Sequence, residues 1–157
     1  MFFMEITKAL LGAGCFWGIE EYYRKIDGIK DTKVGYSGGD FSNPSYEDVC
    51  SKTTGHAEVI LIKFDVNFVS YSKILDHFWI CHDPTQLNRQ GFSIGTQYRS
   101  AIFYYSDEQK NIAEKSKSVF QKKLFSPIVT EITKAKEFFI AEDYHQCYIQ
   151  KKRQPEK

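Results

Sequence analysis

The stretch Gly12-Ala13-Gly14-Cys15-Phe16-Trp17-Gly18 follows a strand-like apolar run at residues 9–11 and precedes a helix-like amphipathic run at residues 19–25. Cys15 is therefore expected at a turn from strand to helix. There its sulfur can face the unpaired N–H groups of the first helical turn, which favours the reactive thiolate. The glycines allow a sharp turn, and the two aromatic residues after Cys15 can wall an apolar pocket. The alternative is an inert buried cysteine between two core aromatics.

Composition and charge argue against several classes of protein, namely nucleic-acid-binding, membrane-binding and membrane-spanning proteins. The 157-residue chain has a net charge of +1 with acids and bases interspersed, which argues against nucleic-acid or anionic-membrane partners. No run approaches the roughly 18 apolar residues of a membrane span. Residues 1–8 lack the basic start of a signal peptide, so we expect a cytoplasmic protein. We expect a monomer with one catalytic domain at residues 1–150 and a basic tail at residues 151–157.

The alternation of apolar patterns predicts an α+β fold. We expect a two-layer sandwich of a mixed or antiparallel sheet with packed helices, a ferredoxin-like core and long active-site loops. The expected strands are residues 5–11, 30–36, 56–65, 98–105 and 128–133, with an extended piece at 137–140. The expected helices are residues 16–25, 45–51, 71–80, 106–124 and 143–150. A loop as long as residues 81–97 is usually functional when it is not disordered, and we expect a functional loop here.

Glu58 is the unusual residue of the strand expected at residues 56–65. Alternation along a strand places Glu58 on the same face as Ile60, Ile62 and Phe64. A carboxyl group on an apolar face needs partners, or its pKa rises because burial penalises the charged form. The alternative is that Glu58, near the start of the strand, simply reaches solvent.

The four cysteines, at positions 15, 50, 81 and 147, form no Cys-x-x-Cys pair. A thioredoxin-type motif or a zinc ribbon is therefore disfavoured. A reducing cytosol also disfavours a static disulfide framework, so thiol chemistry stays open. We interpret Cys50 and Cys81 as structural.

Three constellations could carry chemistry. A Cys-His hydrolase would pair Cys15 with one of three histidines, His56, His82 or His145, but nothing in the sequence places one beside the sulfur. A metal site could draw on His56, Cys81, His82 and Asp83. Three of these are consecutive, and adjacent ligands rarely close one shell, so we expect no metal. The third set combines a Cys15 thiolate with three proton donors, Glu58, Tyr46 and Tyr98, around an oxygen-bearing substrate. A redox sensor or binding module could use the same pocket without turnover.

Seven segments of the chain, in order, resemble the peptide methionine sulfoxide reductase A (MsrA) family. The segments are Gly14-Cys15-Phe16-Trp17-Gly18 and residues 34–39, 43–50, 55–59, 82–91, 95–102 and 141–146. Together they run from residue 14 to residue 146, nearly the whole chain. Seven motifs in register are far more specific than any one of them.

The resemblance implies reduction of the S epimer of methionine sulfoxide, free or within proteins. Cys15 would attack the sulfoxide sulfur and become a sulfenic acid, with a neutral Glu58 as the acid. Tyr46 and Tyr98 would surround the sulfoxide oxygen. Four residues would bind the substrate: Phe16 and Trp17 around its methyl group, Asp83 to order the site, and His145 at the rim. No metal or organic cofactor is expected, and thioredoxin or dithiothreitol-type thiols would supply the electrons.

The sequence departs from the family in the second half of this cycle. Many members carry a resolving cysteine in a glycine-rich C-terminal tail, which this sequence lacks. Cys147 directly follows the motif Tyr144-His145-Gln146, and we expect it to attack the sulfenic acid to give a disulfide that thioredoxin reduces. The alternative is an incidental cysteine, with an external thiol reducing Cys15 directly.

Overall fold

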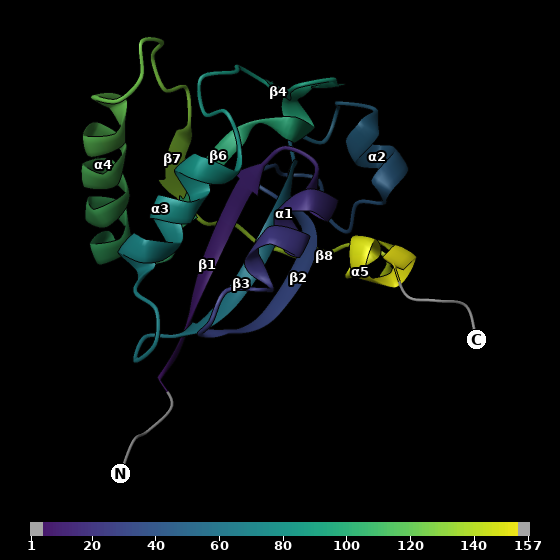
Figure 1. The fold of residues 1–157 in the computed structure, drawn as a ribbon. Helices are drawn as coiled ribbons and strands as arrows, with labels where there is room; N and C mark the ends of the chain where they lie inside the picture. Colours follow the sequence, from purple (N-terminus) through teal and green to yellow (C-terminus); the bar gives the residue numbers. More distant parts are fainter. Residues whose placement is uncertain (1–4, 154–157) are drawn as a thin grey trace.

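The centre of the fold is the long strand pair β1 (Ile6–Ala13) and β3 (Ala57–Asp65) in the computed structural model, which describes residues 5–153 (Figure 1). The remaining strands are β2 (Ile29–Ser37), β4 (Arg89–Gln90), β5 (Ser93–Ile94), β6 (Ser100–Tyr104), β7 (Glu131–Lys134) and β8 (Phe139–Ile140). The helices are α1 (Phe16–Tyr23), α2 (Tyr46–Cys50), α3 (Tyr71–Cys81), α4 (Asp107–Gln121) and α5 (Tyr148–Arg153), with 3₁₀ turns η1 (Thr96–Tyr98) and η2 (Asp143–His145).

The main sheet has the order β7-β6-β1-β3-β2-β8. Its four central strands, β6, β1, β3 and β2, pair antiparallel. Helix α1 connects β1 to β2 and helix α3 connects β3 to β6, which is the ferredoxin-like arrangement. Strand β7 joins β6 in parallel and β8 joins β2 antiparallel, so the whole sheet is mixed. The predicted α+β class is confirmed.

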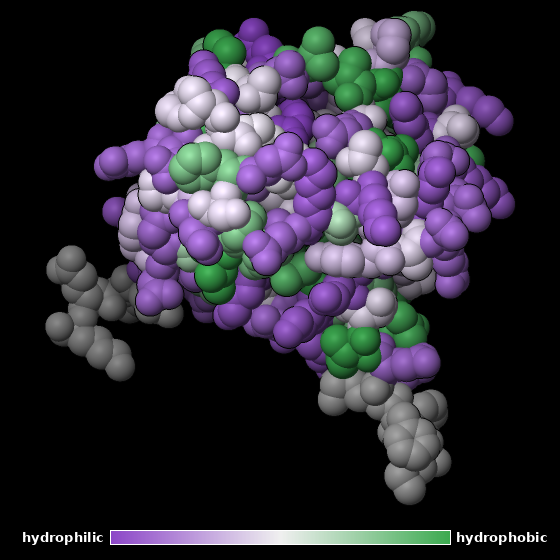
Figure 2. All heavy atoms as spheres, turned by 180° about the vertical axis from the view of Figure 1, so that it is seen from behind, coloured by the Kyte–Doolittle hydropathy of each residue, from purple (hydrophilic) through white to green (hydrophobic). Residues whose placement is uncertain are grey.

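Both faces of the sheet are covered. Because successive strand residues point to opposite faces, β1 sends Ala9 and Leu11 to the larger core and Leu10 to the smaller one. Helices α1, α3 and α4 pack on the larger core. The smaller core contacts Ala135 and Phe138, in the segment that passes behind the sheet from β7 to β8 (Figure 1). From behind, polar side chains cover most of the surface, with small apolar areas between them (Figure 2).

The antiparallel register brings two distant residues to one end of the sheet. Leu11 of β1 pairs with Ile60 of β3, so the end of β1 lies next to the start of β3. Cys15 follows the end of β1, and Glu58 is the second residue of β3. The fold therefore places the sulfur and the carboxyl group at the same edge.

The predicted strand at residues 128–133 is wrong at its start, because β7 begins at Glu131. The preceding backbone groups bond elsewhere. Ile128 donates its N–H to Gln121 Oε1, and Val129 donates to the carbonyl of Pro84. These bonds hold the chain against α4 and the loop after α3 before it joins the sheet.

The predicted single helix at residues 143–150 is also wrong. The chain forms η2 and α5 instead, interrupted at Cys147, whose φ is +50°. Helix α5 includes residues 151–153, the start of the predicted tail, whereas residues 154–157 lie outside the described part of the chain. The loop at residues 81–97 also contains more structure than expected, namely β4, β5 and η1. None of the helices within residues 5–153 has the length and apolar character that a membrane crossing requires.

Candidate active site

Cys15 is the N-cap residue of α1, as the sequence predicts. Gly14 before it has a φ of +91°, a conformation that suits glycine. The backbone N–H groups of Trp17 and Gly18 hydrogen-bond to the sulfur and lower its pKa. Burial and the nearby Glu58 raise the pKa, and burial dominates, so the net shift is upward. The helix N–H groups thus favour the thiolate, as the sequence predicts, but they do not outweigh burial.

Glu58 is buried with a side chain that is only partly satisfied. The residue is 1% exposed, which excludes the alternative that it reaches solvent. Its Oε1 accepts the N–H of Phe16 at 3.2 Å, while Oε2 is buried without a hydrogen-bond partner among the described residues. Burial raises the pKa of Glu58 to about 7, against the opposing effect of the Phe16 N–H. Both protonation states of this carboxyl group are therefore populated near neutral pH.

Two phenols, Tyr46 and Tyr98, lie close to each other and to the site. Tyr46 begins α2, and Tyr98 ends η1. Their side chains hydrogen-bond to each other, and the charges of Glu58 and Cys15 act on Tyr98. Burial raises the pKa of both phenols, so they keep their protons at neutral pH and can donate hydrogen bonds. The structure thus brings together all four residues predicted as catalytic.

His145 lies at the centre of an aromatic cluster rather than at its rim, because η2 folds back over α1. The side chain is 1% exposed, and Nδ1 accepts the Nε1–H of Trp17 at 2.9 Å. Burial lowers the pKa of His145. With Nδ1 accepting, the neutral ring carries its proton on Nε2, 3.9 Å from Glu142 Oε2. The ring contacts four aromatic side chains, Phe16, Trp17, Tyr46 and Tyr144.

Tyr148 is a site neighbour that the sequence pattern did not predict. Its ring stacks on Trp17 with the centroids 3.9 Å apart and the planes at 11°. Trp17 is therefore held by Tyr148 on its face and by His145 at its nitrogen. The available signal was the spacing of Tyr148 three residues after His145, which is a common spacing for side chains on one side of a turn.

Asp83 is exposed, and its hydrogen bonds organise the loop that follows α3. Its carboxylate accepts the N–H and hydroxyl of Thr85 at 3.0 and 2.6 Å and the amide of Gln86 at 3.2 Å, and the Thr85 bonds lower its pKa. Gln90 bonds both the N–H and the carbonyl of Asp83. The Gln90 side chain also packs on Gly14, where a Cβ atom would lie 2.7 Å from its Cγ. The loop thus reaches the site through Gln90.

All four cysteines are free thiols, and they lie in different surroundings. Cys147 donates its N–H to Glu20 Oε1 at 2.6 Å, so it lies against the middle of α1 rather than at its start. Cys50 instead hydrogen-bonds to Tyr46. Cys81 bonds to the carbonyl of Phe78, and burial raises its pKa to about 12, which fits a structural thiol.

The histidines of the hydrolase alternative are engaged elsewhere. His56 accepts the N–H of Gly39, and His82 bonds to Phe78 and Ser100. His145 accepts from Trp17, so each ring has a partner other than Cys15. Within residues 5–153, no group of three or more His, Cys, Asp or Glu side chains is placed to hold a metal ion.

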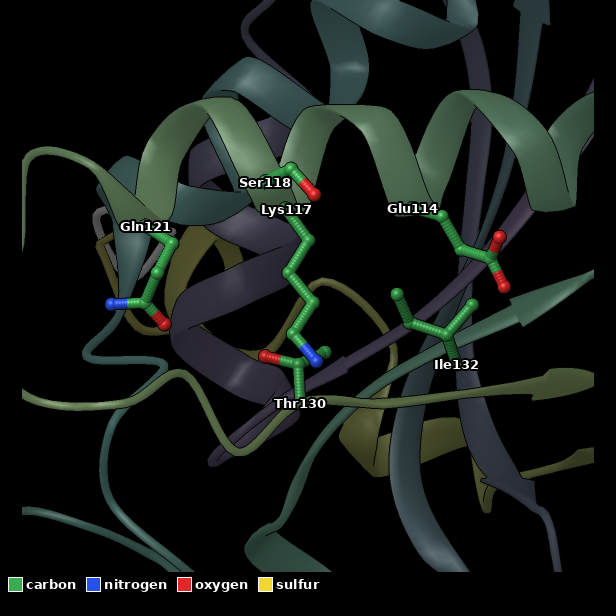
Figure 3. A pocket seen from close by; sticks show the side chains of 6 residues that line it. All are labelled: Glu114, Lys117, Ser118, Gln121, Thr130 and Ile132. Carbon is green, nitrogen blue, oxygen red and sulfur yellow. The ribbon is translucent and has the colours of Figure 1, made fainter.

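A hollow of about 590 Å³ lies between α4 and β7 (Figure 3). It is lined by Glu114, Lys117, Ser118, Gln121, Thr130 and Ile132. Lys117 extends across it toward Thr130 (Figure 3). None of the residues predicted for the site lines this hollow, so it is separate from Cys15.

Comparison with known proteins agrees with this geometry. The model of the family "Peptide methionine sulfoxide reductase" matches residues 7–157. "Peptide methionine sulfoxide reductase MsrA" of Methanosarcina mazei is 54% identical over 149 residues, covering 94% of this chain and 71% of the relative. The MsrA of Methanothermobacter thermautotrophicus is 53% identical over 146 residues, covering 92% and 86% of the two chains.

Solved structures give the same result. Reduced Mxr1 from Saccharomyces cerevisiae superposes with a TM-score of 0.91 at 38% identity, covering 98% of this chain and 89% of Mxr1. Mxr1 in complex with Trx2 superposes with a TM-score of 0.65 at 28% identity, covering 94% and 90%. The chain therefore belongs to the peptide methionine sulfoxide reductase A family.

Proposed function

We propose that this oxidoreductase reduces the S epimer of methionine sulfoxide, free or within proteins, with Cys15 as nucleophile and Glu58 as acid. One observation carries the proposal: Glu58 is a buried carboxyl group beside a cysteine at a helix start, and one of its oxygens has no hydrogen-bond partner within residues 5–153. A sulfoxide is a poor electrophile until its oxygen is protonated or strongly hydrogen-bonded. A carboxyl group with a pKa of about 7 can supply that proton near neutral pH.

The proposed first step transfers oxygen from substrate to enzyme. Glu58, Tyr46 and Tyr98 donate to the sulfoxide oxygen while the Cys15 sulfur attacks the substrate sulfur. The N–H groups of Trp17 and Gly18 stabilise the negative charge that develops on Cys15 once its proton leaves. The S–O bond of the substrate and the transient bond between the two sulfurs then break. Methionine leaves reduced, and the oxygen ends on the Cys15 sulfur as a sulfenic acid, whose hydroxyl proton replaces the one that the thiol lost.

The proposed substrate pocket uses the aromatic cluster. Phe16 and Trp17 form the apolar wall for the methyl group, and His145 holds the Trp17 ring through its nitrogen. Asp83 orders the loop that packs on Gly14. His145 and Asp83 thus act on the substrate through the shape of the pocket as well as by contact.

The proposed second step regenerates the thiol. Cys147 attacks the sulfenic acid, which releases water and forms a Cys15–Cys147 disulfide, and thioredoxin then reduces that disulfide. This step requires Cys147 to leave its hydrogen bond to Glu20. The Trx2 complex of the similar Mxr1 supports thioredoxin as the partner. Because the cycle needs reduced thioredoxin and no further cofactor, we place it in the cytoplasm.

Turnover of the two separated sulfoxide epimers, with thioredoxin or dithiothreitol as electron source, tests the proposed function. We expect turnover of the S epimer alone and no turnover by Cys15→Ser. Binding without turnover would favour the redox sensor or binding module, and reduction of the R epimer would contradict the proposal.

Counting free thiols after one addition of S-sulfoxide, without reductant, tests Cys147. The wild type should lose two thiols and Cys147→Ser only one. Cys50→Ser is the matched control, and it should still lose two. Loss of a single thiol by the wild type would instead support direct reduction by an external thiol.

A further inference from the structure

Glu142 lies where three elements meet. Its Oε1 accepts the hydroxyl of Tyr36 in β2 at 3.2 Å. Its Oε2 accepts the N–H of Tyr46 in α2 at 3.3 Å and the hydroxyl of Tyr144 in η2 at 3.3 Å. One carboxylate therefore bonds to its near neighbour Tyr144 and to Tyr36 and Tyr46, which lie about a hundred residues earlier in the sequence.

Helix α2 depends on such contacts for its position. It has only five residues, too few to be stable alone in water. Its capping box, between Ser45 and Asp48, lies within the helix itself and fixes nothing outside it. The N–H of Tyr46 is one of the first helical N–H groups, which have no partner inside a helix, and a carboxylate there is favourable. Glu142 thus attaches the start of α2 to the C-terminal segment.

The same carboxylate also faces the aromatic cluster. Glu142 Oε2 lies 3.9 Å from Nε2 of His145, the nitrogen that carries the proton because Trp17 donates to Nδ1. Glu142 therefore lies next to Tyr46, which we propose donates a hydrogen bond to the sulfoxide oxygen. It also lies next to the aromatic cluster that we propose contacts the methyl group of the substrate.

We propose that Glu142 is a positioning residue, which holds α2 against η2 so that the Tyr46 hydroxyl meets the sulfoxide oxygen. The inference rests on the proposed function, in which Tyr46 donates to that oxygen. Glu142 itself touches neither the reacting sulfur nor the oxygen. It acts through the backbone N–H of Tyr46, because the position of this backbone determines where the phenol ring of Tyr46 lies.

Hydrogen exchange of the Tyr46 amide, followed by NMR, tests the contact without any reaction. Glu142→Gln removes the charge and one of the two accepting oxygens that three donors share, and it should speed exchange of this amide by about tenfold, as expected when a hydrogen bond to a charged group is weakened or lost. Glu137→Gln is the matched control, since Glu137 is an exposed acid in the same segment. It should leave the Tyr46 amide unchanged. Equal exchange in the wild type and Glu142→Gln would overturn the proposal.

A double-mutant cycle on Cys15 oxidation in a single turnover tests the consequence. At saturating sulfoxide, Glu142→Gln should slow the wild type by about tenfold, with KM little changed, and should add nothing in a Tyr46→Phe background. Independent, additive losses would show that Glu142 does not act through Tyr46. If Tyr46→Phe keeps the full rate, the proposed role of Tyr46 is wrong, and the amide measurement still accepts or rejects the Glu142 contact.

Discussion

Two buried glutamates, Glu20 and Glu58, are each 1% exposed but differ in how their oxygens are used. Glu20 is fully bonded: Oε1 accepts the N–H of Cys147 at 2.6 Å, and Oε2 accepts the hydroxyl of Thr32 at 2.8 Å. Glu58 accepts one N–H, from Phe16, and its second oxygen has no partner among residues 5–153. A satisfied buried carboxylate joins elements, whereas an unsatisfied one is available to a ligand.

The unpartnered oxygen of Glu58 has a cost in free energy, and this cost supports the proposed role of Glu58 as an acid. Leaving a buried polar group unpaired is unfavourable, and the protein keeps Glu58 by letting its pKa rise to about 7. A carboxyl group that only stabilises the fold gains nothing from a raised pKa and an unpartnered oxygen. A general acid gains a great deal, since the ideal pKa of a catalytic group lies near the working pH.

The largest expected effect is on the rate of sulfenic acid formation at Cys15, where the two glutamates should differ. Glu58→Gln should slow formation of the Cys15 sulfenic acid by about 10² or more, the usual contribution of a general acid. Glu20→Gln should leave this step nearly unchanged, because Glu20 bonds to Thr32 and Cys147 and to neither reacting group. Rapid-quench measurement of a single turnover without reductant gives both rates. Equal rates for wild type and Glu58→Gln would remove Glu58 from the chemistry.

The next effect concerns stability and its pH dependence. The folded pKa of Glu58 is raised to about 7 from an ordinary 4.5, so the folded state binds the extra proton between these values. The stability that this proton supplies is complete below pH 4.5 and is lost as the pH rises to 7. Relative to Glu58→Gln, the wild type should therefore lose up to about 3 kcal/mol of unfolding free energy over this range.

Urea unfolding of both proteins at several pH values measures that loss. The comparison with the variant matters because His82 acts in the opposite direction. Burial lowers its pKa to about 4, so its contribution rises with pH over part of the same range. A constant difference between the two proteins across the range would mean that Glu58 is not buried as a neutral acid.

The smallest effect belongs to Glu20. Glu20→Gln can keep both contacts, because the amide oxygen accepts the Cys147 N–H and the amide NH2 group donates to the Thr32 hydroxyl, but it replaces a charged acceptor by a neutral one. We expect a loss of about 1 kcal/mol in unfolding free energy. Unchanged stability, or a loss of sulfenic acid formation as large as that of Glu58→Gln, would erase the distinction between the two acids.

The sequence predicted the outline of the fold and the centre of the site for identifiable reasons. The strand-turn-helix around Cys15 has strong local signals, and alternation alone placed Glu58 on the face of Ile60 and Ile62. The start of β7 was not predictable, because residues 128 and 129 bond to Gln121 and Pro84, partners that only the folded chain supplies.

The remaining errors have the same origin. The Cys147 break in the last predicted helix depends on the N–H of Cys147 reaching Glu20, more than a hundred residues earlier in the sequence. His145 was expected at the rim because its burial under Trp17 and Tyr144 comes from η2 folding back. The net pKa of Cys15 reflects burial by the whole site, which a local pattern cannot report.

The pH dependence of sulfenic acid formation, measured in single turnovers of wild type and Glu58→Gln, tests the central claim most directly. Because the pKa of the Cys15 thiol is raised, its thiolate fraction grows with pH, and in Glu58→Gln the rate should keep rising through pH 7. In the wild type this rise should level off near pH 7, because Glu58 then loses the proton that we propose it donates. The same pH profile in both proteins, or a wild-type rate that rises through pH 7 without levelling off, would contradict the account.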